Sequence, residues 1–184
     1  MVPLTALWLP IVVSAIFVFI ASMILHAGLP FWHRRDYRPT GNEAPFVEAS
    51  RSLEPGFYSF PSVQWNKMTA EEQEEWRRGP VGFMYLRKAA SISMGRTFVL
   101  HFLYCLVGSF LAAYVATIAA GRGAEYLHVH RAAGTAGMLF WAFGTNFSDA
   151  IWYGKPWTAA FKSLIDGVIY GFLIGGTFGW LWPG

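Results

Sequence analysis

Ionisable and polar side chains occur inside three apolar stretches of this chain, where lipid would make them costly. His101 lies in the first of these stretches, Asp149 in the second and Asp166 in the third. A charged side chain inside a bilayer costs at least about 2.5 kcal/mol unless it is paired or hydrated. We therefore expect these groups to meet in one buried network near one membrane surface, and its candidate members are His101, Asn146, Asp149, Lys162, Asp166 and Tyr170.

Three kinds of chemistry are open to such a network. The polar groups can satisfy one another and fix the register of the helices, which is the interpretation we favour because polar pairs commonly join membrane helices. They can form a proton or ion relay, because intramembrane ionisable residues often mark such pathways. They can also hold a metal or haem, since His26 and His101 lie toward the same side. One histidine per helix is weak evidence, so we assign no catalytic residue, no metal ligand and no cofactor.

Two stripes of small residues recur at every fourth position, which places each stripe on one face of a helix. Small residues let two helix backbones approach closely inside a membrane. We therefore expect both stripes to be helix-packing interfaces, either within the chain or between subunits. The members of the first stripe are Gly108, Ala112 and Ala116, and those of the second are Gly167, Gly171, Gly175 and Gly179.

The composition indicates a membrane protein. Hydrophobic residues make up 54% of the 184 residues and charged residues only 14%, whereas about a quarter of the residues in a soluble domain are charged. Four apolar windows are long enough to cross about 30 Å of hydrocarbon. The predicted spans are Leu4–Leu25, Phe98–Ala120, Ala132–Tyr153 and Phe161–Trp182.

Basic residues predict the orientation of these spans. Ten of them lie between the first and second spans, whereas the connection after the second span holds only Arg122 and Arg131. Positive charge collects on the cytoplasmic side of membrane proteins, so both termini should lie on the periplasmic or exoplasmic side. The basic residues of the insert are interleaved with Glu71, Glu72, Glu74 and Glu75, so no nucleic-acid surface is expected.

The chain therefore divides into residues 1–26 as the first transmembrane helix, 27–97 as a cytoplasmic insert and 98–184 as a three-helix transmembrane region. Within the insert, Thr69 and Glu72 form a capping box and Gly79-Pro80 is a stop signal, which predicts a helix over 70–78. Another helix is expected over 44–53, and the aromatic stretches 56–60 and 81–87 are expected to be extended, with pairing as an option. The predicted fold is an all-α membrane protein with four transmembrane helices and a small α/β insert between the first two.

Several stretches resemble a family of small, uncharacterised bacterial inner-membrane proteins. The stretches that carry the resemblance are Gly56–Pro61, Gly79–Gly82, Phe102–Leu106, Gly134–Ala136, Ile151–Trp157 and Gly176–Pro183. The resemblance implies a bacterial inner-membrane location and a shared fold. It implies no activity and no role for any residue.

No catalytic signature is present: the sequence lacks a phosphate-binding glycine loop, a zinc-protease motif, paired cysteines and a nucleophile elbow. We therefore expect a non-catalytic accessory or structural subunit. Its predicted partners are the lipid bilayer and either other membrane subunits or further copies of the chain. An energy-converting complex is one candidate assembly. The alternative function is a small oligomeric transporter or a proton or ion channel that uses the intramembrane Asp and His residues.

Overall fold

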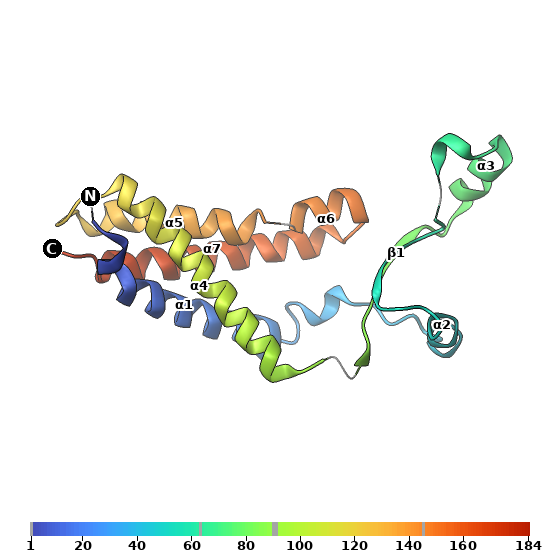
Figure 1. Cartoon of the computed structure of the whole chain (residues 1–184), viewed down its shortest axis with the longest axis horizontal. Coiled ribbons are helices and arrows are strands. Elements are labelled where there is room, and N and C mark those ends of the chain that lie inside the picture. The colour runs from blue at the N-terminus through green and yellow to red at the C-terminus, as the bar shows by residue number, and fades with distance from the viewer. Residues whose placement is uncertain (1, 63, 90–91, 145) are drawn as a thin grey trace.

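The computed structural model describes residues 2–62, 64–89, 92–144 and 146–184, with only the backbone of Trp65. Most of these residues are helical. In Figure 1 the long helices lie side by side in one bundle, and the insert between α1 and α4 projects from one end of it. Both chain termini lie at the opposite end of the bundle. We call the end that carries the insert the insert end.

Among the described residues, three helices are long and apolar enough to cross a membrane: Leu4–Gly28, α4 (Met94–Ala119) and α7 (Trp157–Trp180). The first consists of a 3-10 turn at Leu4–Leu7, α1 (Trp8–Met23) and a π turn at Ile24–Gly28. These helices correspond to the first, second and fourth predicted spans. Three of the predicted spans are therefore confirmed as helices long and apolar enough to cross a membrane, with ends that differ from the predicted ends by a few residues.

The third predicted span is not one continuous helix. The structure has α5 (Tyr126–Ala142) and α6 (Asn146–Tyr153) in this region. Phe143 is the C-cap of α5 and departs from helical geometry, with φ −107° and ψ 5°. The prediction of a continuous helix over Ala132–Tyr153 is therefore wrong. It rested on hydropathy, which stays high past Ala142, where α5 ends.

The terminal glycine stripe packs against α5. A Cβ atom added to Gly167 would lie 2.5 Å from the Ala142 backbone nitrogen, and one added to Gly175 would lie 2.6 Å from the His130 carbonyl oxygen. Gly171 approaches α5 just as closely, because an added Cβ would lie 2.8 Å from the carbonyl oxygen of Gly134. Real Cβ atoms essentially never come within 3.0 Å of other heavy atoms. The stripe is therefore an interface within the chain, which is one of the two possibilities that the sequence left open.

The stripe on α4 also lies inside the bundle. Ala112 and Ala116 are buried, and an added Cβ at Gly108 would lie 2.9 Å from the Phe140 ring. The helix packs against both α1 and α5. Both small-residue stripes thus hold the bundle together.

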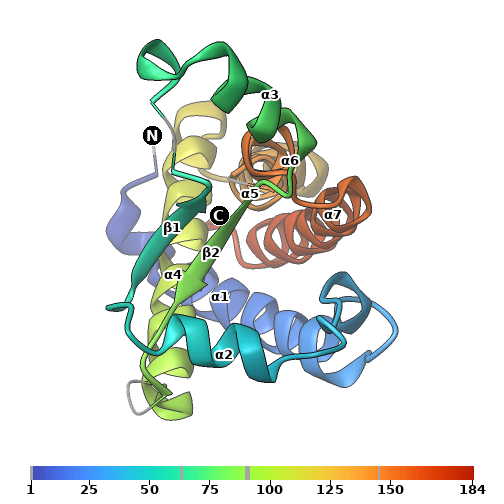
Figure 2. The same ribbon diagram turned by 90° about the vertical axis from the view of Figure 1, so that its right-hand side faces the viewer.

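The insert forms a two-stranded hairpin with one short helix before the first strand and another in the connection between the strands. It contains α2 (Ala44–Ser50), β1 (Gly56–Phe60), α3 (Ala70–Arg78) and β2 (Gly82–Leu86). The strands pair antiparallel, with Gly56 opposite Leu86 and Phe60 opposite Gly82. The predicted helix over 70–78 is confirmed at both ends, with the Thr69–Glu72 capping box in place. Figure 2, which looks at the insert end, places β1 and β2 in front of the helix ends.

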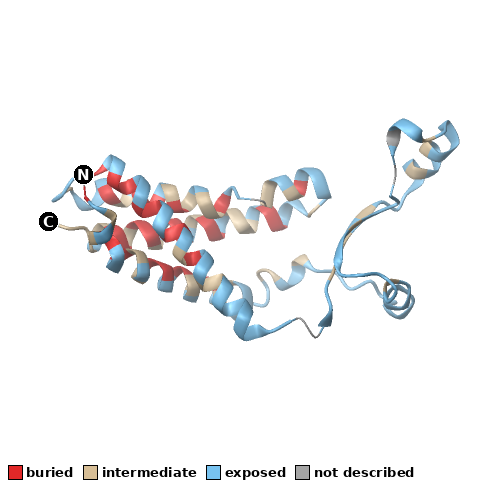
Figure 3. Ribbon diagram, viewed as in Figure 1, coloured by how far each residue is buried: buried red, intermediate tan, exposed pale blue. Residues whose placement is uncertain are grey.

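Burial is confined to the bundle (Figure 3). Of the described residues between Ser22 and Cys105, none is buried. The hairpin nevertheless contacts the bundle at Tyr153, the last residue of α6. The ring centroids of Phe57 and Phe83 lie 5.6 and 5.0 Å from the ring centroid of Tyr153. The insert is therefore seated on the bundle by aromatic contacts but has no core of its own among these residues.

Candidate functional site

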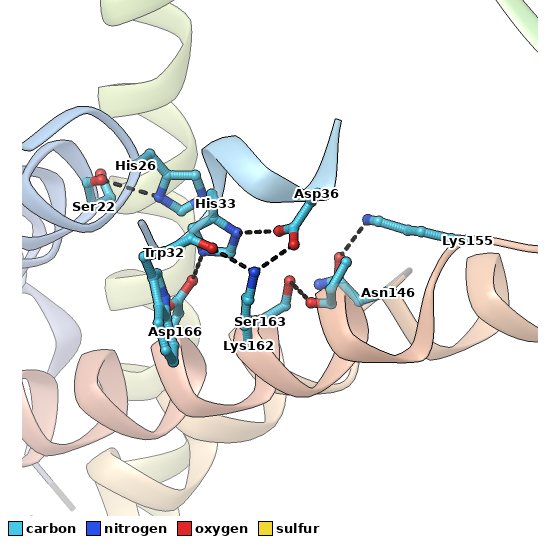
Figure 4. Close-up of polar contacts among 11 residues, drawn as sticks. Ser22, His26, Trp32, His33, Asp36, Asn146, Lys155, Lys162, Ser163 and Asp166 are labelled. Atoms are coloured by element: carbon cyan, nitrogen blue, oxygen red, sulfur yellow. Dashed lines mark hydrogen bonds and ion pairs between the residues drawn. The ribbon is translucent and has the colours of Figure 1, made fainter. Parts of the chain in front are cut away.

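Asp166 on α7 is the most deeply buried charged side chain of the described residues, with an exposed fraction of 3%. Both of its carboxylate oxygens accept hydrogen bonds from the segment that follows α1. Trp32 Nε1 donates to Oδ1 at 2.8 Å, and His33 Nε2 donates to Oδ2 at 2.6 Å. A buried carboxylate is tolerated only when it is paired and hydrogen-bonded in this way. Trp32 thus does more than anchor at the membrane interface (Figure 4).

Lys162 and Asp36 complete this arrangement one helical turn away. The Lys162 ammonium donates to the Trp32 carbonyl oxygen and to Asp36 Oδ1. His33 Nδ1 donates to Asp36 Oδ2 at 3.0 Å. We refer to Trp32, His33, Asp36, Lys162 and Asp166 as the Asp166 cluster.

The Asp166 cluster brings two carboxyl groups together with one imidazole and one ammonium. Both ring nitrogens of His33 face carboxylate oxygens, so the geometry suits a ring that donates a hydrogen bond from each nitrogen. Burial raises the pKa of Asp36, but hydrogen bonds from Lys162 and His33 outweigh that effect and leave the pKa below its usual value. The cluster ties the segment after α1 to α7.

His26 lies directly beside this cluster. Its ring stacks on the His33 ring with the centroids 4.2 Å apart and the planes at 13°. Its Nδ1 donates to the Ser22 carbonyl oxygen at 3.0 Å, so the neutral ring keeps its lone pair on Nε2. One nitrogen of His26, one nitrogen of His33 and a carboxylate oxygen of Asp166 all lie within 4.8 Å of one another. These three residues have the donor types that bind transition metals.

The structure divides the predicted network among separate partners. Lys162 and Asp166 lie in the Asp166 cluster, but neither pairs with His101 or Asp149 in the contacts of the described residues. His101 Nε2 instead hydrogen-bonds the hydroxyl of Ser22 on α1 at 2.7 Å. The predicted direct link between His101, Asp149, Asp166 and Lys162 is therefore not made, because α1 and the segment after it supply the partners of His101, Lys162 and Asp166.

Asn146 and Asp149 lie on α6. The Lys155 ammonium donates to Asn146 Oδ1 at 3.2 Å and lies 4.0 Å from Asp149 Oδ2. The Asp149 side chain is 31% exposed, so it is less enclosed than Asp166. Its partner comes from the chain just after α6.

A cavity of about 210 Å³ lies between residues of the predicted network and residues that the sequence did not single out. Its polar lining comes from α1, the π turn after it, α4, α5, α6 and α7, and consists of Ser22, His26, His101, Tyr104, Trp141, Asn146, Ser163, Asp166 and Tyr170. Tyr170 is 3% exposed, and its hydroxyl has no hydrogen-bond partner among the described residues. The same holds for the buried indole Nε1 of Trp141. Two residues of the cavity wall therefore carry a buried polar group that no described residue satisfies.

The sequence did not identify Trp32, His33 and Asp36 as site residues. They lie just after the first span in a run of basic residues, where interfacial anchoring and topology account for their types. One signal was available: Asp36 is an acid among His33, Arg34 and Arg35. Asp166 also needed a partner that α4 and α6 do not supply.

No protein-family model, curated protein or solved structure matches this chain. The three long apolar helices class it as a helical membrane protein with a small two-stranded insert. The resemblance to small bacterial inner-membrane proteins stays a prediction.

Proposed function

We propose that this chain is a non-catalytic membrane subunit whose insert docks a partner protein at the cytoplasmic face. The observation that carries the proposal is the insert itself. It spans more than sixty residues between α1 and α4, yet none of its described residues is buried. A segment of this length that has regular structure without a core is typical of a surface that another protein covers.

The aromatic face of the hairpin is the proposed docking surface. Phe57, Phe83 and Tyr85 share this face, and 47%, 42% and 69% of their surfaces are exposed. Phe57 stacks on Tyr85 with the ring centroids 4.4 Å apart, which holds the rings in fixed positions. Exposed aromatic side chains that are already ordered are typical of interface hot spots, because little side-chain entropy is lost on binding.

A protein fits this surface better than lipid does. In Figure 1 the insert extends beyond the helix ends, roughly along the axis of the bundle, and not along its lipid-facing sides. The hairpin would therefore stand away from the hydrocarbon. The ten basic residues of the 34–96 region support a cytoplasmic location for it.

The membrane part of the proposal has four crossings. α5 and α6 together would make the crossing between α4 and α7, which puts both termini on the periplasmic side. The seventeen residues of α5 reach only about 25 Å at 1.5 Å per residue, so α6 is needed to complete the span. The small-residue stripes pack the bundle internally, so we assign partner binding to the insert.

Site-specific photo-crosslinking in native membranes tests this function. A benzophenone amino acid at Tyr85 should yield one discrete protein adduct, which mass spectrometry identifies. Tyr37 is 84% exposed but lies outside the hairpin, so a crosslinker there is the matched control. The double variant Phe57→Ser and Tyr85→Ser should lose co-purification of the identified partner while it stays in the membrane. A chain that is extracted gently and runs as a lone monomer, without adduct, would refute the proposal.

A small oligomeric transporter or a proton or ion channel is the second candidate. The cavity beside Asp166 favours it, because Tyr170 and Trp141 offer unused hydrogen-bonding groups there. Flux into proteoliposomes should then fall in Asp166→Asn and be little changed in Asp149→Asn, because Asp149 does not line this cavity. Equal flux in both variants and in the unmodified chain would count against transport through this site.

A further inference from the structure

We propose that His26, His33 and Asp166 form a binding site for a divalent first-row transition metal such as Zn²⁺ or Fe²⁺. Two imidazoles and one carboxylate are a common ligand set for these ions. The three candidate ligand atoms lie within 4.8 Å of one another. Ligand atoms about 2.0–2.2 Å from one metal lie about 3–3.5 Å apart, so small side-chain rotations bring the set to bonding distance.

Each candidate ligand is already held by a second partner on its far side. His26 Nδ1 donates to the Ser22 carbonyl oxygen at 3.0 Å, which leaves the Nε2 lone pair for a ligand. Trp32 Nε1 donates to Asp166 Oδ1 at 2.8 Å, which leaves Oδ2. Outer hydrogen bonds of this kind fix the tautomer and orientation of metal ligands in known sites.

His33 has the most specific arrangement. Its Nδ1 donates to Asp36 Oδ2 at 3.0 Å, and its Nε2 faces Asp166 Oδ2 at 2.6 Å. A metal would bind His33 Nε2 in place of its hydrogen, which leaves to solvent as a proton, and the distance from Nε2 to Asp166 Oδ2 would widen from 2.6 Å to about 3–3.5 Å. Asp36 then becomes the outer carboxylate of an aspartate–histidine–metal arrangement.

The backbone at His26 supports this inference. His26 lies in the π turn Ile24–Gly28 that ends the first helix. This turn places the His26 ring against the His33 ring at 4.2 Å. The hydrogen bonds of the Asp166 cluster are complete without His26. A metal ion bound to both histidines would explain why the His26 ring lies beside His33.

The adjacent cavity provides an open coordination position. His26 and Asp166 both line the cavity of about 210 Å³, together with the unpartnered groups of Tyr170 and Trp141. A buried polar group without a partner costs about 1–3 kcal/mol. A water molecule or small anion on the metal would accept hydrogen bonds from these groups. Three protein ligands and one exchangeable ligand are typical of zinc and iron sites that remain accessible to small molecules.

Metal binding is measured on the full-length chain, purified in detergent with an affinity tag that lacks histidine and stripped with a chelator. Titration with Co²⁺ should give visible d–d absorption that saturates at one ion per chain, and elemental analysis should find one Zn²⁺ after zinc loading. His26→Gln should weaken Co²⁺ binding at least tenfold. His26 is exposed, so this variant leaves the bundle packed. The matched control His128→Gln should bind like the unmodified chain.

Co²⁺ binding tests the metal site, and the azide response tests the open coordination position. Equal Co²⁺ binding by His26→Gln, His128→Gln and the unmodified chain, or no binding by any of them, would overturn the metal site. Azide should shift the Co²⁺ spectrum if a coordination position opens to the cavity, and Tyr170→Phe should weaken that shift. A spectrum that does not respond to azide would overturn the open position. Neither result bears on the docking role proposed for the insert.

Discussion

The contact between Gly167 on α7 and Ala142 on α5 gives the sharpest test of the packing. A Cβ atom on Gly167 would lie 2.5 Å from the Ala142 backbone nitrogen, 2.6 Å from its Cα and 2.7 Å from its Cβ. Carbon atoms in good contact are about 3.5–4.0 Å apart. The two helices must therefore separate by about 1 Å to admit one methyl group, and no flexible side chain can yield in their place.

The cost of Gly167→Ala follows from that displacement. Overpacking a close-packed interface by one methyl group costs about 1–3 kcal/mol. For a chain of this size, each kcal/mol corresponds to about 2–4 °C in the unfolding temperature. We expect Gly167→Ala to unfold about 2–12 °C below the unmodified chain, measured by circular dichroism of α-helix loss in detergent micelles.

Gly176→Ala is the matched control on the same helix. The nearest atom to a Cβ there is the Tyr126 hydroxyl oxygen at 3.6 Å, which is ordinary contact. Alanine also favours helix over glycine by about 1 kcal/mol in water. Gly176→Ala should therefore unfold no earlier than the unmodified chain. If Gly167→Ala and Gly176→Ala unfold at the same temperature, α5 and α7 do not meet as closely as the structure has it.

Three further substitutions probe the Asp166 cluster and the insert. Trp32→Phe keeps the ring but removes the hydrogen bond to Asp166, so the free energy of unfolding should fall by about 1–3 kcal/mol in the same thermal assay. Lys162→Met leaves the Asp36 carboxylate without its ammonium partner and should cost about 1.5–3 kcal/mol, whereas an unchanged unfolding temperature would mean that the pair is not formed. Thr69→Ala removes the N-cap of α3 and should speed amide exchange in that helix by the equivalent of about 0.5–2 kcal/mol, with no change in α7.

Local signals predicted the insert well. The helix over 70–78 agrees at both ends because Thr69, Glu72 and Gly79 fix its boundaries through nearby backbone groups. The paired strands were predicted as extended stretches, because both stretches are rich in aromatic residues. Hydropathy located three helices for the same reason, since each span is a property of its own window. Hydropathy could not locate the end of α5 at Ala142. Hydropathy is averaged over many residues, so one turn that leaves helical geometry does not change the average.

The Asp166 cluster could not be predicted from local sequence signals. His33 and Asp166 are 133 residues apart in the sequence, and no periodicity connects a juxtamembrane segment to a particular turn of the last helix. The sequence did predict that Asp166 must be paired, because an isolated charge at that depth is costly. It could not say that the partner comes from outside the spans. Three-dimensional proximity was the missing information.

The position of the Asp166 cluster links the membrane bundle to the insert. Asp36 ends the 3-10 turn Arg34–Asp36, and the chain continues from it toward α2 and the hairpin of the insert. The cluster therefore fixes the point and direction at which the insert leaves the bundle. The second attachment is the contact of Phe57 and Phe83 with Tyr153. Two attachments on different helices hold the hairpin at a set orientation, which is what a docking surface requires if its partner is also bound to the membrane. Loss of the cluster would release one attachment and leave the aromatic face intact, so partner affinity should fall without any change in the contact residues.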